Sequence, residues 1–505
     1  MKRMYSLTLM PTDNNSVKIL SDTLKKVVLY IYSALAILIH FVRCFDNSFW
    51  GDEGLVILAA RKNWGDMIEY VAENGHSPLY YAFAWLCVHI FGESGVVYHM
   101  SFALAYFIIV LVTAIVVRRC FGYIAAFITV TFCAMLDCAI TYNLEVRMYT
   151  WCQLFIFLTF ITAYMVHKTR MNRYYILLTL FSIGAVYSHY FALASIGIIY
   201  LFLLFGSKKD IGKVFLSGGT VIVALVPWLI YAKTISGVIM SNYSISLVPW
   251  KDCFEFIFKS KYSFVILSCF VVSVLLAFIY DRKIIDMNKN DKGIAFRFSC
   301  VKKNFKLNYE WKWIISGIFA VFGTISAAEI ISHTMFPIIV LRYLYVSYII
   351  LWLIFGIVIS KLKYKRLWAI VLIFAVLSSG VPTYASTLDV EIQQSKRLEA
   401  TLQATTPIID EHDFIYTDII HLAWTVASVY YPKTPHDLFG YAEWWGPIEL
   451  PEFDTSVDYW LFLSSPISDH ILDNLHNQNC DAKLVVENGF IGTGSVWIYK
   501  VVHTD

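Results

Sequence analysis

The feature that most constrains this chain is a series of long apolar runs between residues 24 and 386. A run of roughly 18 to 24 apolar residues can cross the hydrocarbon core of a bilayer as a helix. We count about eleven such runs, at 24–45, 96–117, 121–141, 147–166, 174–189, 190–205, 212–232, 262–280, 311–331, 338–360 and 367–386. A hydrophobic content of 58%, a charged content of 15% and a mean hydropathy of +0.61 exclude an ordinary soluble domain. The sequence therefore predicts a polytopic α-helical membrane protein.

One shorter apolar stretch, "PLYYAFAWLCVHIFG" (78–92), is ambiguous. Counting it as a span would divide the short Lys- and Arg-rich loops between the two sides of the membrane. Leaving it out places nearly all of them on one side, together with the N-terminal segment 1–23, and the Lys/Arg bias assigns that side to the cytoplasm. We therefore predict that residues 47–95 form a large amphipathic first outer loop with interfacial helices.

After residue 386 the sequence becomes polar and acidic, which predicts a domain boundary. Strand-like and helical patterns alternate there, at 411–418, 419–431, 457–465, 467–478, 482–488 and 495–500. We expect a transmembrane domain over 24–386, followed by a small extracytoplasmic α/β domain over 387–505.

Ionisable residues gather at the predicted outer ends of the apolar runs and in the loops beside them. An ionisable group at membrane depth is costly, and such a group tends to face a bundle interior or a water-filled site. A charge at a helix end is also the least costly to keep, so each residue alone has a purely structural explanation. The set predicts one polar cavity that opens outward: His40, Asp46, Asp52, Glu53, His76, Asp137, Glu145, Arg147, His189, Glu329, His333 and Arg342.

The order of five short motifs carries a resemblance to a known family. "WGDEG", "NGHSPLYY", "RRCFG", "NLEVRMY" and "FPIIVLRYLYV" follow one another as in bacterial membrane glycosyltransferases of the GT-C fold. The chain resembles most the protein O-mannosyltransferases and the lipid A aminoarabinose transferases. The resemblance implies that a sugar moves from a polyprenyl-phosphate donor to a lipid, protein or polysaccharide acceptor on the outer face of the plasma (inner) membrane. It also implies inversion at the anomeric carbon. The topology alone fits an ER membrane as well.

The resemblance also implies catalytic residues. Asp52 matches the acidic residue of the first outer loop, and transfer to a hydroxyl needs a carboxylate that accepts a proton or orients the nucleophile. Glu53 shares this catalytic assignment, with the alternative that it holds the loop by binding a backbone amide.

Further residues match positions that bind the donor. Arg147 and Arg342 would bind the donor phosphate, since the guanidinium group offers a planar fork of donors, although snorkelling toward lipid headgroups is an alternative for both. His76 and Tyr343 complete the phosphate site. His76 precedes Ser77 and Pro78, whereas the relatives often show His-Pro-Pro or Lys-Pro-Pro, so its role is less defined. The residues that would contact the sugar or the acceptor are Glu145, Tyr80 and Tyr149.

No cofactor motif is recognisable, because the sequence lacks a P-loop, a dinucleotide-binding glycine loop and a zinc-ligand cluster. The sequence leaves open whether a divalent metal ion binds, and His189 is the candidate ligand. Two other function classes fit a polytopic chain: a flippase or transporter of lipid-linked sugars, and a non-catalytic lipid-binding scaffold. A transporter would favour an internal repeat and midplane polar groups, which we do not find in the sequence. Nothing indicates nucleic-acid binding.

Overall fold

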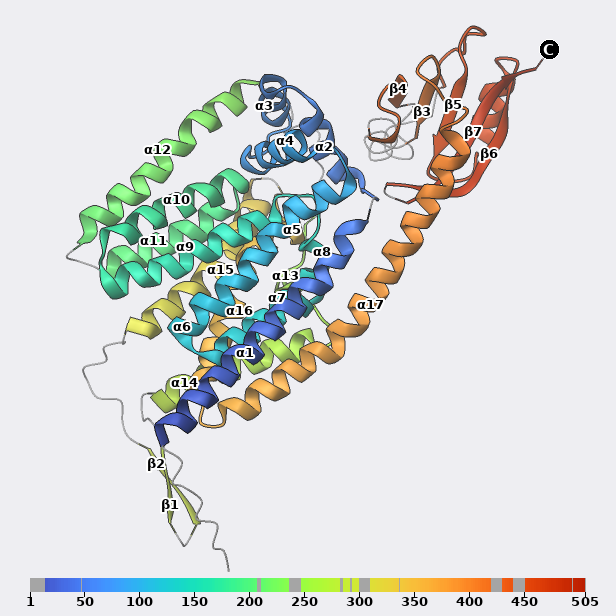
Figure 1. Cartoon of the computed structure of the whole chain (residues 1–505). Helices are drawn as coiled ribbons and strands as arrows, with labels where there is room; N and C mark the ends of the chain where they lie inside the picture. The colour runs from blue at the N-terminus through green and yellow to red at the C-terminus, as the bar shows by residue number, and fades with distance from the viewer. Residues whose placement is uncertain are drawn as a thin grey trace, which may run out of the picture.

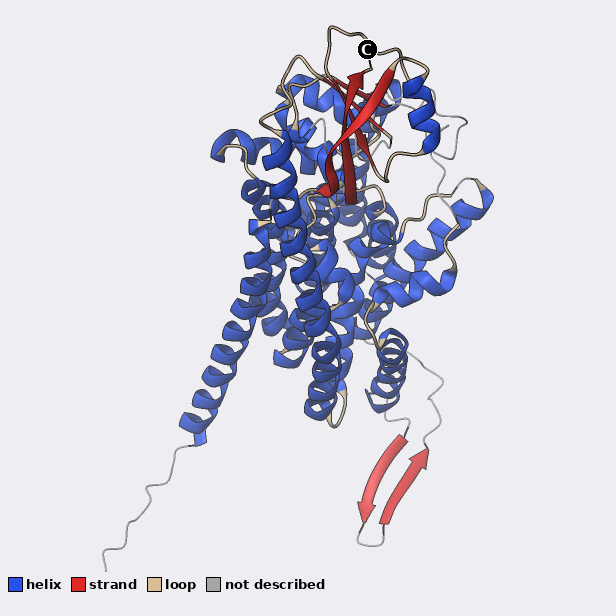
Figure 2. Cartoon of the chain, turned by 90° about the vertical axis from the view of Figure 1, so that its right-hand side faces the viewer, coloured by secondary structure: helices blue, strands red, loops and turns tan. Residues whose placement is uncertain are grey.

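The computed structural model describes residues 14–46, 48–206, 210–235, 247–281, 285–290, 293–298, 309–335, 337–418, 429–438, 450–492 and 494–504. A bundle of helices forms the body of the molecule (Figure 1). A β-sheet domain lies at one end of the bundle, and a two-stranded hairpin projects from the other end (Figure 2). The predicted N-terminal segment 1–23 lies partly outside the described residues, which begin at residue 14.

Eight helices of the described residues are long and apolar enough to cross a membrane. They are α1 (Asn14–Phe41), α5 (Gly95–Val112), α9 (Tyr149–Thr169), α12 (Ile211–Ile235), α14 (Ser263–Asp281), α15 (Tyr309–Thr334), α16 (Leu341–Lys361) and α17 (Lys365–Thr405). The remaining apolar runs form shorter helices, α7 (Tyr123–Met135), α10 (Asn172–Ser188) and α11 (Ala192–Gly206). Every predicted apolar run therefore overlaps a helix, and the predicted polytopic helical membrane fold is confirmed.

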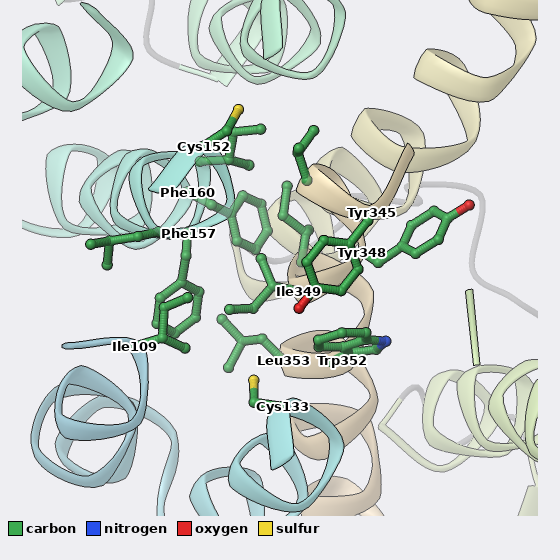
Figure 3. Close-up of a cluster of buried hydrophobic side chains, with 14 of the residues drawn as sticks. Ile109, Cys133, Cys152, Phe157, Phe160, Tyr345, Tyr348, Ile349, Trp352 and Leu353 are labelled. Carbon is green, nitrogen blue, oxygen red and sulfur yellow. The ribbon is translucent and has the colours of Figure 1, made fainter. Parts of the chain in front are cut away.

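Helix α16 runs through the centre of the bundle and organises the core. Its side chains pack against α7 and α9, as Figure 3 shows for one buried cluster that also includes Ile109 of α5. The labelled side chains there are at most 2% exposed: Ile109, Cys133, Cys152, Phe157, Phe160, Tyr345, Tyr348, Ile349, Trp352 and Leu353. Close packing of this kind fixes the position of α16. The first turn of α16, which carries Arg342 and Tyr343, is therefore held firmly.

The predicted first outer loop contains three short helices, α2 (Gly51–Arg61), α3 (Trp64–Glu73) and α4 (Leu79–Phe91). They lie at the end of the bundle that faces the β-sheet domain (Figure 1). Asn63 caps α3 by accepting a hydrogen bond from the Asp66 amide at 3.0 Å. The hairpin of β1 (Ile285–Asn290) and β2 (Gly293–Phe298) belongs to the Lys- and Arg-rich stretch 281–306, which the Lys/Arg bias assigns to the cytoplasmic side, and it lies at the opposite end. The two loops predicted to lie on opposite sides of the membrane thus lie at opposite ends of the bundle.

The C-terminal part contains a mixed five-stranded sheet with the order β4-β3-β5-β7-β6. Its strands are β3 (Phe414–Thr417), β4 (His436–Leu438), β5 (Tyr459–Leu463), β6 (Cys480–Ile491) and β7 (Gly494–His503). Strand β3 pairs in parallel with β4 and β5, whereas β7 pairs antiparallel with β5 and β6. Helix α19 (Asp469–His476) overlaps the predicted helix 467–478. Most of the other predicted helix, 419–431, lies outside the described residues.

Helix α17 connects the membrane bundle to this sheet without a break. It is 41 residues long and continues through residue 386 to Thr405, so the predicted boundary falls inside a helix. The polar composition after residue 386 marks a change of surroundings rather than the end of the helix. The division into 24–386 and 387–505 remains a proposal.

Candidate active site

The candidate site lies where the first turn of α2 meets the loop before α9 and the first turn of α16. Glu53 joins two of these pieces. One of its carboxylate oxygens accepts a hydrogen bond from the Trp50 amide at 3.0 Å, and the other accepts one from the Val146 amide at 2.7 Å. The amides at a helix start lack partners within the helix, which explains why a carboxylate three residues along binds back to Trp50. Glu53 thus fixes the start of α2 against the loop 143–148.

Two arginines converge on Asp52, the neighbour of Glu53. Arg342 Nη2 donates to Asp52 Oδ2 at 2.8 Å, and Arg147 Nη2 lies 3.7 Å from the same oxygen. Arg147 Nη1 also donates to the Asp52 backbone carbonyl at 3.0 Å. The side chain of Arg147 is 3% exposed and that of Arg342 is 23% exposed. Arg147 is therefore a fixed part of the wall, whereas Arg342 is the more accessible of the two cations.

Several buried polar atoms around this cluster lack a hydrogen-bond partner among the described residues. They include Nε of both Arg147 and Arg342, the hydroxyl of Tyr149 and both carboxylate oxygens of Glu145. The Trp50 indole lies close to Glu145 without a bond of normal geometry. A buried polar group without a partner is costly, and native structures rarely keep several in one place. A ligand rich in oxygen atoms could supply partners for these groups.

Aromatic and histidine side chains form the adjoining wall. The ring centroids of His189 and Tyr343 are 4.9 Å apart, and Tyr149 lies 6.1 Å from His189. Tyr80 stacks at a tilt on Tyr81, with ring centroids 4.2 Å apart, and both rings lie near Arg147.

His76 lies on the same side of the site, with its ring 5.8 Å from that of Tyr81. The structure thus brings together ten of the predicted residues: Asp52, Glu53, His76, Tyr80, Glu145, Arg147, Tyr149, His189, Arg342 and Tyr343. The other five residues predicted for the same cavity have their contacts elsewhere. Glu329 pairs with His333, His40 is bonded to the Ala134 carbonyl, Asp46 to Ser395, and the Asp137 amide to the Lys259 carbonyl.

Burial sets the protonation of the loop residues in the site. It raises the pKa of Glu53 to about 8, and the nearby charge of Glu145 adds to this shift. It also raises the pKa of Glu145 to about 7, although Arg147 opposes the shift. Desolvation and the charge of Arg147 lower the pKa of His76 to about 3. At neutral pH, His76 is therefore a neutral imidazole, and it can contact a phosphate only as a hydrogen-bond donor.

The surroundings of His189 do not resemble a metal site. Its Nδ1 accepts a hydrogen bond from the Phe191 amide at 3.1 Å, and its ring packs against Tyr149, Tyr343 and Phe191. In the described part of the chain, no three His, Cys, Asp or Glu side chains are grouped so that they could hold a metal ion. We assign His189 to the aromatic wall.

Comparisons with known proteins agree with this architecture. Two crystal structures of ArnT from Cupriavidus metallidurans, one in the apo state and one bound to undecaprenyl phosphate, superpose on the chain with a TM-score of 0.57 each. The alignments cover 94% of this chain and 97% of ArnT, at 10% and 11% sequence identity. The chain has the GT-C fold. The resemblance expected from the sequence is thus confirmed at the level of the fold.

The sequence model of the dolichyl-phosphate-mannose-protein mannosyltransferase family matches residues 75–231 of this GT-C chain. The matched region includes His76, Glu145 and Arg147 but ends before Arg342. A search of curated proteins by sequence gives no significant match. The family match and the GT-C fold together support a membrane glycosyltransferase.

Some neighbours of the site had no predicted role. Trp50 lies in the "WGDEG" motif, and the Arg342 guanidinium lies 5.3 Å from the centre of its ring. In the sequence, only the position of Trp50 two residues before Asp52 indicates that it lies at the site. Tyr430 of the C-terminal part contacts the chain just before Asp52, since its hydroxyl accepts a hydrogen bond from the Phe49 amide at 3.3 Å. No pattern in the sequence points to that contact.

Proposed function

We propose that the chain is an integral membrane glycosyltransferase that moves a sugar from a polyprenyl-phosphate donor to an acceptor on the outer face of the plasma membrane. One observation carries the proposal: Arg147 and Arg342 converge on Asp52, and each keeps a buried Nε–H donor without a partner among the described residues. Guanidinium groups with spare donors suit a phosphate. Binding of undecaprenyl phosphate by ArnT, which shares the fold, supports a polyprenyl lipid.

In the proposed reaction, the acceptor hydroxyl oxygen attacks the anomeric carbon while the bond from that carbon to the phosphate oxygen breaks. The hydroxyl proton passes to the carboxylate of Asp52, which acts as the general base. The electron pair of the broken bond stays on the phosphate, and the two arginines stabilise its charge. A single displacement of this kind inverts the anomeric carbon.

The other residues have supporting roles in this proposal. Glu53 uses both carboxylate oxygens on backbone amides, so we assign it to positioning Asp52 rather than to proton transfer. His76 and Tyr343 lie on the phosphate side. Glu145, Tyr80 and Tyr149 offer buried polar atoms without normal partners for the hydroxyl groups of the sugar or acceptor.

Asp52 and the donor phosphate would compete for Arg342. The carboxylate of Asp52 contacts Arg342 at 2.8 Å. A bound phosphate would draw this accessible guanidinium toward itself, while Arg147 stays bonded to the Asp52 backbone carbonyl. The carboxylate would then be released toward the acceptor hydroxyl.

The test is mass spectrometry of the purified protein in detergent with a panel of polyprenyl-phosphate sugars, with lipid, protein and polysaccharide acceptors supplied in turn. Wild type is compared with Asp52→Asn and Arg342→Ala, and Glu93→Gln serves as a control because it removes a carboxylate from another arginine ion pair. We expect free polyprenyl phosphate from wild type and Glu93→Gln only. Tight binding of a donor that no protein consumes would refute the transferase and favour a flippase or a scaffold.

A further inference from the structure

A short piece of chain leads from α1 to the acidic pair, and we call its described residues, 42–46 and 48–50, the approach segment. Helix α17 holds its first half. Arg43 Nε donates to Glu391 Oε2 at 2.9 Å, while Arg43 Nη1 donates to the Ile140 carbonyl at 2.7 Å. The hydroxyl of Ser395 donates to the Asp46 carboxylate. These polar contacts attach the approach segment to the helix that connects the bundle with the C-terminal sheet.

The second half of the approach segment contacts residues that lie beyond α17 in the chain. The Phe49 amide donates to the Tyr430 hydroxyl at 3.3 Å. At the other end of α2, Arg61 Nη2 donates to the Val429 carbonyl at 3.0 Å. Phe49 lies two residues before α2, and Arg61 is the last residue of α2. Both are therefore bonded to residues 429–430 of the C-terminal part. Asp52 lies between these two contacts.

Burial shows that this piece belongs to two cores at once. Val429 is 7% exposed and joins the hydrophobic core of the membrane bundle, and Tyr430 packs against the same core. The next residue, Tyr431, is 5% exposed and belongs to the core of the C-terminal sheet, where its hydroxyl is bonded to that of Thr405. Consecutive residues packed into two cores leave little freedom for relative movement. The C-terminal domain is thus coupled rigidly to the start of α2.

We propose that Tyr430 is a positioning residue through which the C-terminal domain sets the place of Asp52. The effect on transfer rests on the proposed function, whereas the effect on the approach segment does not. A general base must lie within hydrogen-bond reach of its proton, and a misplacement of about 1 Å can lower a rate by about a hundredfold. Loss of the Tyr430 bond would loosen the approach segment without touching Arg147 or Arg342, which bind the phosphate.

The test compares Tyr430→Phe with Tyr431→Phe in the full-length protein. The first removes the hydroxyl bonded to Phe49 and keeps the ring, and the second removes the neighbouring hydroxyl, which is bonded to Thr405 instead. Hydrogen–deuterium exchange of a peptide spanning 47–55 reports the approach segment directly. We expect faster exchange and a kcat about tenfold lower for Tyr430→Phe, with the Kd for undecaprenyl phosphate within about twofold of wild type. Tyr431→Phe should match wild type in all three.

Each other outcome has a distinct meaning. Unchanged exchange in Tyr430→Phe would overturn the proposal, because the hydroxyl would not hold the approach segment. Faster exchange with an unchanged kcat would also overturn it, since the segment would then move without moving Asp52. A wild type that consumes no donor would refute the proposed function alone, and the exchange data would still show whether Tyr430 holds the approach segment.

Discussion

Replacing the proposed catalytic base should strengthen binding of the lipid phosphate while abolishing transfer. In the wild type, the Asp52 carboxylate lies 2.8 Å from Arg342 and 3.7 Å from Arg147. In Asp52→Asn, this carboxylate is gone and no longer competes with a phosphate for the two arginines. A phosphate on the same two guanidinium groups would lie on the order of 5 Å from the carboxylate, where two negative charges repel by about 3 kcal/mol at an effective dielectric of 20. Partial exposure of Arg342 reduces this to about 1–2 kcal/mol, which corresponds to binding about 5- to 30-fold tighter.

The assay is a titration with undecaprenyl phosphate, followed by the fluorescence of the tryptophans, because Trp50 lies against Arg342. Glu93→Gln is the matched control and should bind like wild type. The double variant Asp52→Asn with Arg342→Ala should lose the gain in affinity. Equal or weaker binding by Asp52→Asn would refute the competition between the carboxylate and the phosphate.

Three further predictions concern stability, each followed by thermal unfolding in detergent. The pKa of Glu145 rises from 4.5 to about 7 on folding, so its own contribution to stability falls as the pH rises from about 4.5 through about 7, whereas the lowered pKa of His76 contributes with the opposite sign. The stability of wild type relative to Glu145→Gln should therefore fall over that range, and a difference that does not change with pH would contradict the assignment. Arg147→Ala should lower the free energy of unfolding by about 3 kcal/mol because it leaves a buried carboxylate short of a partner. Arg342 is more exposed, so Arg342→Ala should lower it by about 1 kcal/mol, and equal losses in the two variants would contradict this difference. Gly380→Ala should destabilise the protein, since its Cβ would overlap the carbonyl oxygen of Met135 in α7. Gly219→Ala, in open space within α12, should stabilise it by about 0.5–1 kcal/mol. A stabilising Gly380→Ala would show that α17 and α7 separate easily.

The sequence predicted which residues meet because each lies at the end of an apolar run on one predicted side. This was sufficient to group Asp52, Arg147 and Arg342, although Asp52 and Arg342 are separated by 290 positions. The Lys/Arg bias specifies the side of the membrane, and the position of a residue within its apolar run specifies its depth.

Other features depend on contacts that no local pattern encodes. The end of α17 was missed because a composition change at residue 386 reports a change from lipid to water, while the backbone stays helical to Thr405. Strand β4 has three residues and no alternation that could identify it. The two amides that Glu53 binds, those of Trp50 and Val146, could not be named from the sequence, because the second bond depends on the tertiary position of the loop.

The contact between Arg43 and Glu391 has a consequence for biosynthesis. The two residues are 348 positions apart, and a ribosome adding about 5–20 residues per second needs about 20 to 70 seconds to make the stretch between them. During that interval the acidic pair already exists, while the helix that holds its approach segment has not yet been inserted. The proposed base is thus among the first parts of the site to be synthesised and the last to be fixed. A nascent chain therefore cannot complete the proposed site until α17 has been made.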